Sequence, residues 1–304
     1  MFSHKYRSFS AYSLLFMAII LLSSCSPSLQ PSDPFVESSP TLTIPEQTPS
    51  MGSSAATPQI QPAIQCNQPG KISQTDFFST LLGARLVFDI YFPPCFDNNV
   101  KAGYPALYLL HGQTYDQTQW QKLGIQVYAD QLIQSGRISP FLIIMPNEQF
   151  HFRSPDGNQF PIAILEELIP WVEANLHARP QKNWRAIGGI SRGASWAMRL
   201  ALQNPALFGA VGGHSLPTFN SDLKQLPGWL EKIPPGQLPR IYLDIGKLDP
   251  EVQSAAQFEQ VLSRLGIPHQ WHLNEGRHNE DYWQQHISDY LDWYTLYWRS
   301  VPAL

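Results

Sequence analysis

Short hydrophobic runs alternate with amphipathic segments from about residue 64 to the end of the chain. A strand buried on both faces is a continuous hydrophobic run, whereas a helix repeats its hydrophobic residues every three or four positions. The predicted strands lie at residues 106–110, 141–145, 184–187, 208–212, 241–245 and 270–274, and the predicted helices at 120–133, 162–176, 194–204, 250–265 and 281–299. This alternation predicts an α/β fold with a mostly parallel central sheet and helices on both faces.

Two further segments complete the expected domain. Residues 76–82 and 85–92 are strand-like and meet at Gly83-Ala84, which predicts an antiparallel hairpin at the N-terminal edge of the sheet. Residues 215–239 contain several prolines and show no regular pattern, so we expect a loop or a small cap over a site.

The first 63 residues lack the pattern of a folded domain. Residues 1–24 combine a basic start with a hydrophobic core, Leu14–Leu22, that is too short to span a membrane, and we expect a lipoprotein signal peptide. Residues 25–63 are rich in Pro, Ser, Thr and Gln and predict a disordered tether. The folded domain is then expected at residues 64–304.

Each of the three cysteines has an expected role. Leu22-Ser-Ser-Cys25 resembles the bacterial lipobox, which implies cleavage before Cys25 and a lipid anchor on it; an ordinary secretory signal with an incidental cysteine is the alternative. Cys66 and Cys95 flank the predicted hairpin. In an exported protein we expect them to form a disulfide, with two buried free thiols as the alternative, because sequence does not give their separation.

Composition excludes some classes of function. Charged residues make up 14% of the chain and the net charge is -4, without the clustered Lys and Arg that nucleic-acid binding needs. There is no H-E-x-x-H motif and the cysteines do not cluster, so we expect neither a metal site nor a cofactor.

One turn carries candidate chemistry. Gly189-Ile-Ser191-Arg-Gly193 is a G-x-S-x-G motif between a predicted strand and a predicted helix. On such a turn the serine hydroxyl is presented above the sheet, and the positive end of the helix favours an oxyanion beside it. Five-residue matches of this kind also occur by chance, so the motif alone is equally compatible with a glycine-rich turn and an idle serine.

Residues after other predicted strands favour the functional interpretation. Ligands and catalytic groups of an open α/β sheet gather beyond the carboxyl ends of its strands. Asp249 follows the strand at 241–245, and His278 follows the strand at 270–274. With Ser191 they occur in the order serine, acid, histidine, which is the order expected of an α/β-hydrolase.

Other residues compete for these roles. Asp244 lies within a predicted strand, where a structural role is expected, and Glu251 begins a helix. His214 follows a strand, where it could line the pocket or support structure. Four aromatic residues could form a binding pocket, although packing explains each one more simply: Trp120, Phe152, Trp229 and Trp283.

From about residue 70 to 300 the chain resembles the esterase-D-type "putative esterase" family of α/β-hydrolases, which includes feruloyl and acetyl-xylan esterases, S-formylglutathione hydrolase, enterochelin-type esterases and mycolyltransferases. The matching segments are Tyr108–Gly112, Gly188–Ser195, Asp244–Asp249 and Gly276–Trp283. Together they are specific for the family and poorly specific for a substrate.

The resemblance implies a role for each site residue. Ser191 would be the nucleophile, His278 its general base and Asp249 the residue that orients the imidazole. The backbone N–H groups of Gln113 and Arg192 would form the oxyanion hole.

We therefore expect a membrane-anchored, extracytoplasmic serine carboxylesterase that acts through an acyl-enzyme. Its substrates would be small or polysaccharide-linked feruloyl, acetyl or related esters. Acyl transfer of the mycolyltransferase type is one alternative, and a non-catalytic binding lipoprotein on the hydrolase fold is another.

Overall fold

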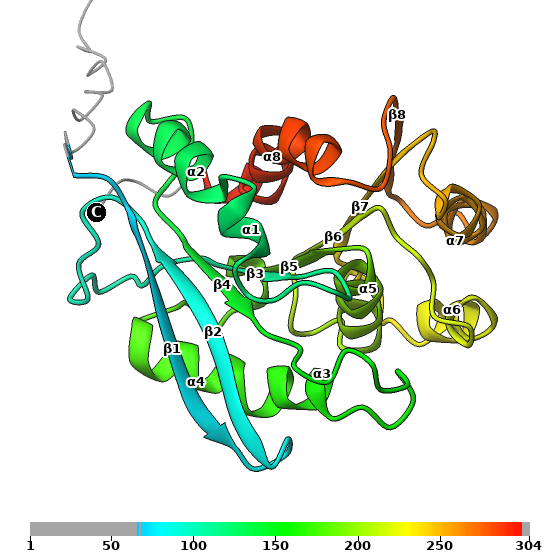
Figure 1. Cartoon of the computed structure of the whole chain (residues 1–304), viewed down its shortest axis with the longest axis horizontal. Helices are drawn as coiled ribbons and strands as arrows, with labels where there is room; N and C mark the ends of the chain where they lie inside the picture. Colours follow the sequence, from blue (N-terminus) through cyan, green and yellow to red (C-terminus); the bar gives the residue numbers. More distant parts are fainter. Residues whose placement is uncertain (1–65, 67, 300–304) are drawn as a thin grey trace, which may run out of the picture. The chain divides into compact units, whose positions relative to one another are not determined.

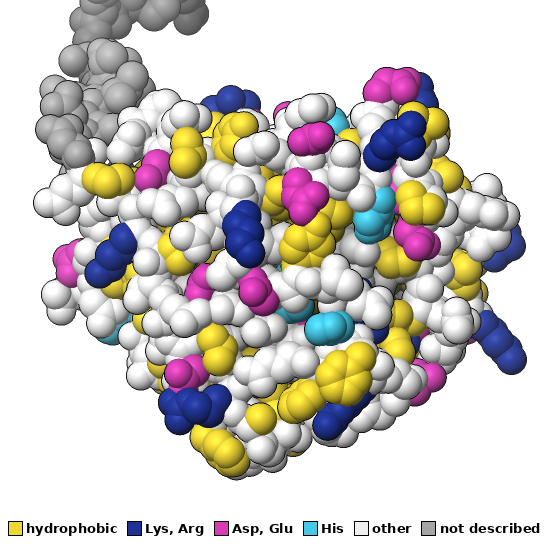
Figure 2. Space-filling view, viewed as in Figure 1, with side chains coloured by type: hydrophobic (Ala, Val, Ile, Leu, Met, Phe, Trp, Pro, Cys, Tyr) yellow, Lys and Arg dark blue, Asp and Glu magenta, His cyan; other side chains and the backbone are white. Residues whose placement is uncertain are grey.

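The computed structural model of the chain describes Cys66 and residues 68–299. The expected signal peptide at 1–24, the lipidation site Cys25 and the tether at 25–63 lie outside these residues. Within the described range, no helix is both long enough and apolar enough to cross a membrane. On the face shown in Figure 2, basic and acidic side chains are interspersed rather than gathered into one basic area.

An eight-stranded sheet forms the centre of the described residues, in the order β1-β2-β4-β3-β5-β6-β7-β8 (Figure 1). The strand β2 pairs antiparallel with β1 on one side and with β4 on the other, and all remaining neighbours are parallel. The predicted α/β fold with antiparallel N-terminal edge strands is confirmed. The bounds are Lys71–Ser79 (β1), Ala84–Phe92 (β2), Ala106–Leu110 (β3), Leu142–Pro146 (β4), Arg185–Ile190 (β5), Ala210–His214 (β6), Arg240–Gly246 (β7) and Gln270–Asn274 (β8).

Helices cover both faces of the sheet because alternate strand residues point to opposite sides. In β3, Tyr108 packs into the core with α3 to α7, whereas Leu107 packs into a second core with α1, α2 and α8. The helix bounds are Gln119–Lys122 (α1), Ile125–Gln134 (α2), Phe160–Ala163 (α3), Ile169–Leu176 (α4), Arg192–Gln203 (α5), Asp222–Glu231 (α6), Val252–Arg264 (α7) and Glu280–Tyr294 (α8).

The structure corrects several predicted boundaries. The single helix expected at 120–133 is two helices, because Gly124 adopts a left-handed φ of 87° between α1 and α2. A π-helical turn, Ile164–Leu168, separates α3 from α4 within the helix expected at 162–176. Residues 215–239 contain α6 rather than only loop, although Pro227 lies inside that helix.

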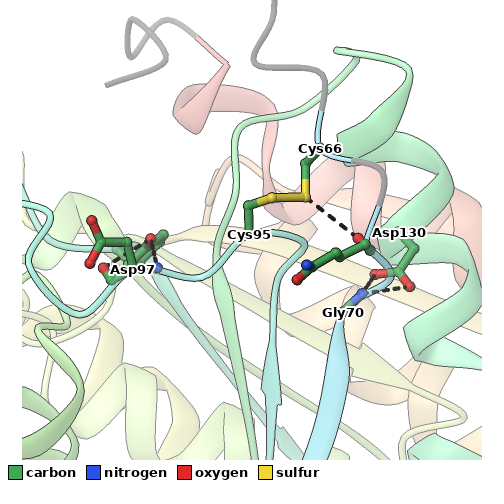
Figure 3. The surroundings of a disulfide bond; sticks show 7 residues. Cys66, Gly70, Cys95, Asp97 and Asp130 are labelled. Atoms are coloured by element: carbon green, nitrogen blue, oxygen red, sulfur yellow. Dashed lines mark hydrogen bonds between the residues drawn. A yellow bond between two sulfur atoms is a disulfide. The ribbon is translucent and has the colours of Figure 1, made fainter.

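The start of β1 is fixed at two points. Cys66 and Cys95 form a disulfide with a Cα–Cα distance of 5.9 Å, which joins the segment before β1 to the loop after β2 (Figure 3). The backbone N–H of Gly70 donates to both carboxylate oxygens of Asp130 on α2, each at 3.1 Å. The edge strand is therefore attached both to its neighbour's loop and to a helix over the sheet.

Candidate active site

The G-x-S-x-G turn links β5 to α5 in a strained conformation. Ser191 has a φ of 54°, in the left-handed region that non-glycine residues rarely adopt. A Cβ on Gly189 would lie 2.3 Å from the backbone of Gly193, and a Cβ on Gly193 would lie 2.4 Å from the carbonyl oxygen of Leu110. Both glycines are therefore required for strand and helix to approach closely enough to present the Ser191 hydroxyl.

Ser191, His278 and Asp249 form one continuous chain of hydrogen bonds. The Nε2 of His278 lies 3.0 Å from Ser191 Oγ, and its Nδ1 lies 2.9 and 3.0 Å from the two carboxylate oxygens of Asp249. The Asp249 side chain is fully buried, whereas that of His278 is 24% exposed. A histidine between a hydroxyl and a buried carboxylate can accept the hydroxyl proton and be stabilised as imidazolium.

The competing acids have other contacts. The Asp244 carboxylate is buried and accepts hydrogen bonds from the hydroxyls of Tyr282 and Tyr290, both at 2.7 Å. It also pairs with Nδ1 of His214 at 2.6 Å, and His214 is fully buried. The interpretation of His214 as a pocket residue is therefore wrong. The backbone N–H of Glu251 donates to Asp249 at 2.8 Å, so Glu251 contacts the acid of the chain rather than replacing it.

The two expected oxyanion donors lie beside Ser191, one on the loop after β3 and one at the start of α5. A Cβ on Gly112, the residue before Gln113, would lie 3.7 Å from the Ser191 Cβ. Arg192 is the first residue of α5, where a backbone N–H has no acceptor within its own helix. Both N–H groups therefore belong to backbone that adjoins the serine.

The four aromatic residues differ in burial and in what they contact. Trp120 and Trp283 are buried and donate to the carbonyl oxygen of Leu110 and to Ser215 Oγ respectively. Trp229 packs against the core, and the Phe152 side chain is 71% exposed. The ring of Trp283 also meets the ring of His278 edge to face at 5.2 Å, a contact that the sequence did not predict.

Sequence reasoning also missed Glu148. Its buried carboxylate pairs with the Arg192 side chain at 2.7 Å, next to the proposed nucleophile. The signal was present, because Pro146-Asn-Glu148 follows a predicted strand at its carboxyl end, where such groups gather.

Among the described residues, no cluster of three or more His, Cys, Asp or Glu could hold a metal ion.

Two curated proteins that the chain resembles in sequence are both named as esterases. The chain is 31% identical over 153 residues to an endo-1,4-beta-xylanase/feruloyl esterase of Xylanibacter ruminicola, covering 47% of this chain and 21% of that protein. It is 28% identical over 231 residues to an esterase of Mycobacterium tuberculosis, covering 58% and 48%. The chain thus spans less than half the length of these curated relatives.

The solved structure of a ferulic acid esterase superposes with a TM-score of 0.67 at 21% identity, covering 75% of this chain and 98% of that one. At this identity the likeness concerns the fold, which is that of the α/β-hydrolases. The sequence model of the family described as "Putative esterase" matches residues 79–294, which is well over half of the chain. The chain therefore belongs to this esterase family of α/β-hydrolases.

Proposed function

We propose that the protein is a serine carboxylesterase that acts through an acyl-enzyme. The observation that carries the proposal is the unbroken hydrogen-bond chain from Asp249 through His278 to Ser191 Oγ, in which no link exceeds 3.0 Å. The strained φ of Ser191 adds support, because strained backbone conformations of this kind cluster at active sites.

The first half-reaction transfers the acyl group to the protein. As Ser191 Oγ adds to the ester carbonyl carbon, its proton passes to Nε2 of His278, and Asp249 stabilises the imidazolium. The negative charge on the former carbonyl oxygen is met by the N–H groups of Gln113 and Arg192 and by the positive end of α5. Collapse expels the alcohol, which takes the proton from His278.

The second half-reaction returns the free enzyme. Water takes the place of the alcohol, gives its proton to His278 and attacks the acyl carbon, and Ser191 leaves with that proton restored. The same three side chains and the same two N–H groups serve both halves, so loss of Ser191 should abolish all turnover.

We further propose that the substrates are feruloyl, acetyl or related esters outside the cytoplasm. A relative named as a feruloyl esterase supports the substrate class. The disulfide between Cys66 and Cys95 supports an oxidising compartment, as does the lipobox-like sequence at Cys25. A lipid on Cys25 would hold the enzyme at the outer side of a membrane.

Two experiments test these proposals. The purified protein should hydrolyse p-nitrophenyl acetate and methyl ferulate, and Ser191→Ala should remove both activities; inactivity on both esters, or an active S191A variant, would contradict the esterase assignment. Cells fed a labelled fatty acid should label the protein, and Cys25→Ser should abolish the label. A C25S variant that stays labelled would refute the anchor.

A further inference from the structure

We infer that Glu148 is a positioning residue that holds both halves of the oxyanion hole in place. It lies just after β4, and the two expected donors lie on the loop after β3 and at the start of α5, beyond β5. Its backbone reaches His111 on the loop after β3, and its carboxylate reaches past that strand to Arg192, the first residue of α5. The inference rests on the proposed function, which assigns the hole to the N–H groups of Gln113 and Arg192.

The first half is set through His111. The backbone N–H of Glu148 donates to Nε2 of His111 at 2.8 Å. Because a backbone N–H can only donate, Nε2 carries no proton, and the proton lies on Nδ1. Nδ1 therefore donates to the carbonyl oxygen of Gly112, which is 2.7 Å away. The tautomer of His111 thus follows from its contact with Glu148.

That hydrogen bond fixes the direction of a catalytic donor. The carbonyl of Gly112 and the N–H of Gln113 belong to one planar trans peptide and point in opposite directions. Holding the carbonyl against His111 therefore aims the N–H of Gln113 the other way. The N–H of Gly112 is held separately by Gln119 Oε1 at 2.8 Å, so the peptide groups on both sides of Gly112 are fixed.

The second half is set through the carboxylate of Glu148. It accepts from Nε and Nη2 of Arg192 at 2.9 and 2.7 Å, in the two-pronged geometry that orients a guanidinium most tightly. Trp196 Nε1 donates at 2.9 Å and Asn158 Nδ2 at 3.1 Å. Both members of the ion pair are buried, with side-chain exposures of 8% for Arg192 and 3% for Glu148. The start of α5 is thereby fixed to the loop that also fixes Gln113.

Glu148→Gln tests the part of this role that the carboxylate plays, because it leaves the backbone contact with His111 in place. A carboxamide has one acceptor oxygen, so it cannot receive donors on both sides as the carboxylate does, and the Arg192 fork is lost on one prong. Deleting an oxyanion donor costs on the order of 100- to 1000-fold in kcat, and misdirecting one should cost about 10- to 100-fold. KM should stay within about twofold, because the oxyanion exists only in the transition state and the intermediate.

Glu173→Gln is the matched control. Glu173 pairs with Arg185, whose side chain is 3% exposed and which begins β5 at the end away from Ser191. Both variants remove a carboxylate from a buried arginine, so both should lower the melting temperature, but only E148Q should lower kcat. If E148Q does not fold, Glu148→Asp provides the second variant, because it keeps the charge and the backbone N–H but withdraws the carboxylate by one methylene.

The readout is hydrolysis of p-nitrophenyl acetate together with binding of a trifluoromethyl ketone. The ketone carbon accepts Ser191 Oγ while the serine proton passes to His278, and the resulting oxyanion probes the hole directly. Its affinity should fall by the same factor as kcat/KM in E148Q or E148D. A folded variant with wild-type kcat, or one with raised KM and unchanged kcat, would overturn the inference alone. Turnover that survives S191A would instead overturn the proposed function.

Discussion

Asp244 and Asp249 should respond in opposite ways to replacement by asparagine. Both are buried carboxylates beside a histidine on neighbouring elements, and both were candidates for the acid. Asp244→Asn should lower the stability of the fold while leaving kcat of the folded molecules within about threefold. Asp249→Asn should do the reverse, because its partner His278 is the one that contacts Ser191.

The magnitudes follow from the contacts. Asp244 accepts hydrogen bonds from His214, Tyr282 and Tyr290. A hydrogen bond to a charged group contributes about 1.5–3 kcal/mol, and one to a neutral group about 0.5–1.5 kcal/mol. Losing the charge at three bonds therefore costs about 3 kcal/mol, a large fraction of the 5–15 kcal/mol typical of a domain. For D249N we expect a loss of about 10³- to 10⁴-fold in kcat and about 1 kcal/mol or less in stability.

Urea unfolding followed by tryptophan fluorescence measures the stabilities. Hydrolysis of p-nitrophenyl acetate in urea-free buffer near pH 8 measures kcat. Active-site titration corrects kcat for the folded fraction. The assignment of Asp249 would be refuted by a D249N enzyme that keeps kcat within tenfold of wild type. It would equally be refuted by a stable D244N enzyme with a kcat loss above a hundredfold.

Three further predictions concern the scaffold. Gly188→Ala places a Cβ 1.7 Å from the hydroxyl oxygen of Tyr294, so it should give insoluble protein or a melting temperature lowered by more than 10 °C, measured by calorimetry. Reducing the disulfide between Cys66 and Cys95, 29 residues apart, should cost about 3–4 kcal/mol in urea unfolding, and C66S/C95S should match the reduced protein. Burial lowers the pKa of His111 below its ordinary 6.5. The neutral imidazole therefore contributes fully to the stability of the fold above pH 6.5, and this contribution is lost as the pH falls through the lowered pKa. His111→Gln should flatten the pH dependence of the unfolding free energy between about pH 7 and 5.

Most of the sheet could be predicted because its strands are buried on both faces and so read as hydrophobic runs. Every residue of β3 and β4 is buried, and both were placed within one residue of their bounds. The first strand was placed late, at residue 76 instead of Lys71, because an edge strand such as β1 has exposed polar residues and little pattern. The helix α6 was missed because Pro227 within it suggests a loop.

The site could be predicted only where a functional residue comes soon after a strand in the sequence, because such residues gather at the carboxyl ends of the strands. Ser191 directly follows β5, Asp249 and His278 lie a few residues beyond the ends of β7 and β8, and the structure brings the three together. Glu148 also follows a strand, but its role depends on an ion pair that reaches past β3 to Arg192 at the start of α5. Such contacts come from tertiary packing, which a single sequence does not encode locally.

Among the described residues, two histidines pair with a buried aspartate, and only one of these pairs suits the proposed acid–base chemistry. His278 and His214 each direct Nδ1 at a buried aspartate, at 2.9 and 2.6 Å. They differ at Nε2, which meets Ser191 Oγ in His278 and the hydroxyl of Tyr294 at 3.0 Å in His214.

A proton given to His214 would leave a buried tyrosinate, and burial raises the pKa of Tyr294 well above 10, which opposes that transfer. In the proposed reaction, the proton given to His278 leaves an alkoxide that is consumed at once by bond formation to a carbonyl carbon, and the partly exposed ring can be reached by substrate. The order of serine, acid and histidine along the chain is therefore compatible with either Asp244 or Asp249 as the acid. The group that contacts Nε2 of each histidine favours Asp249.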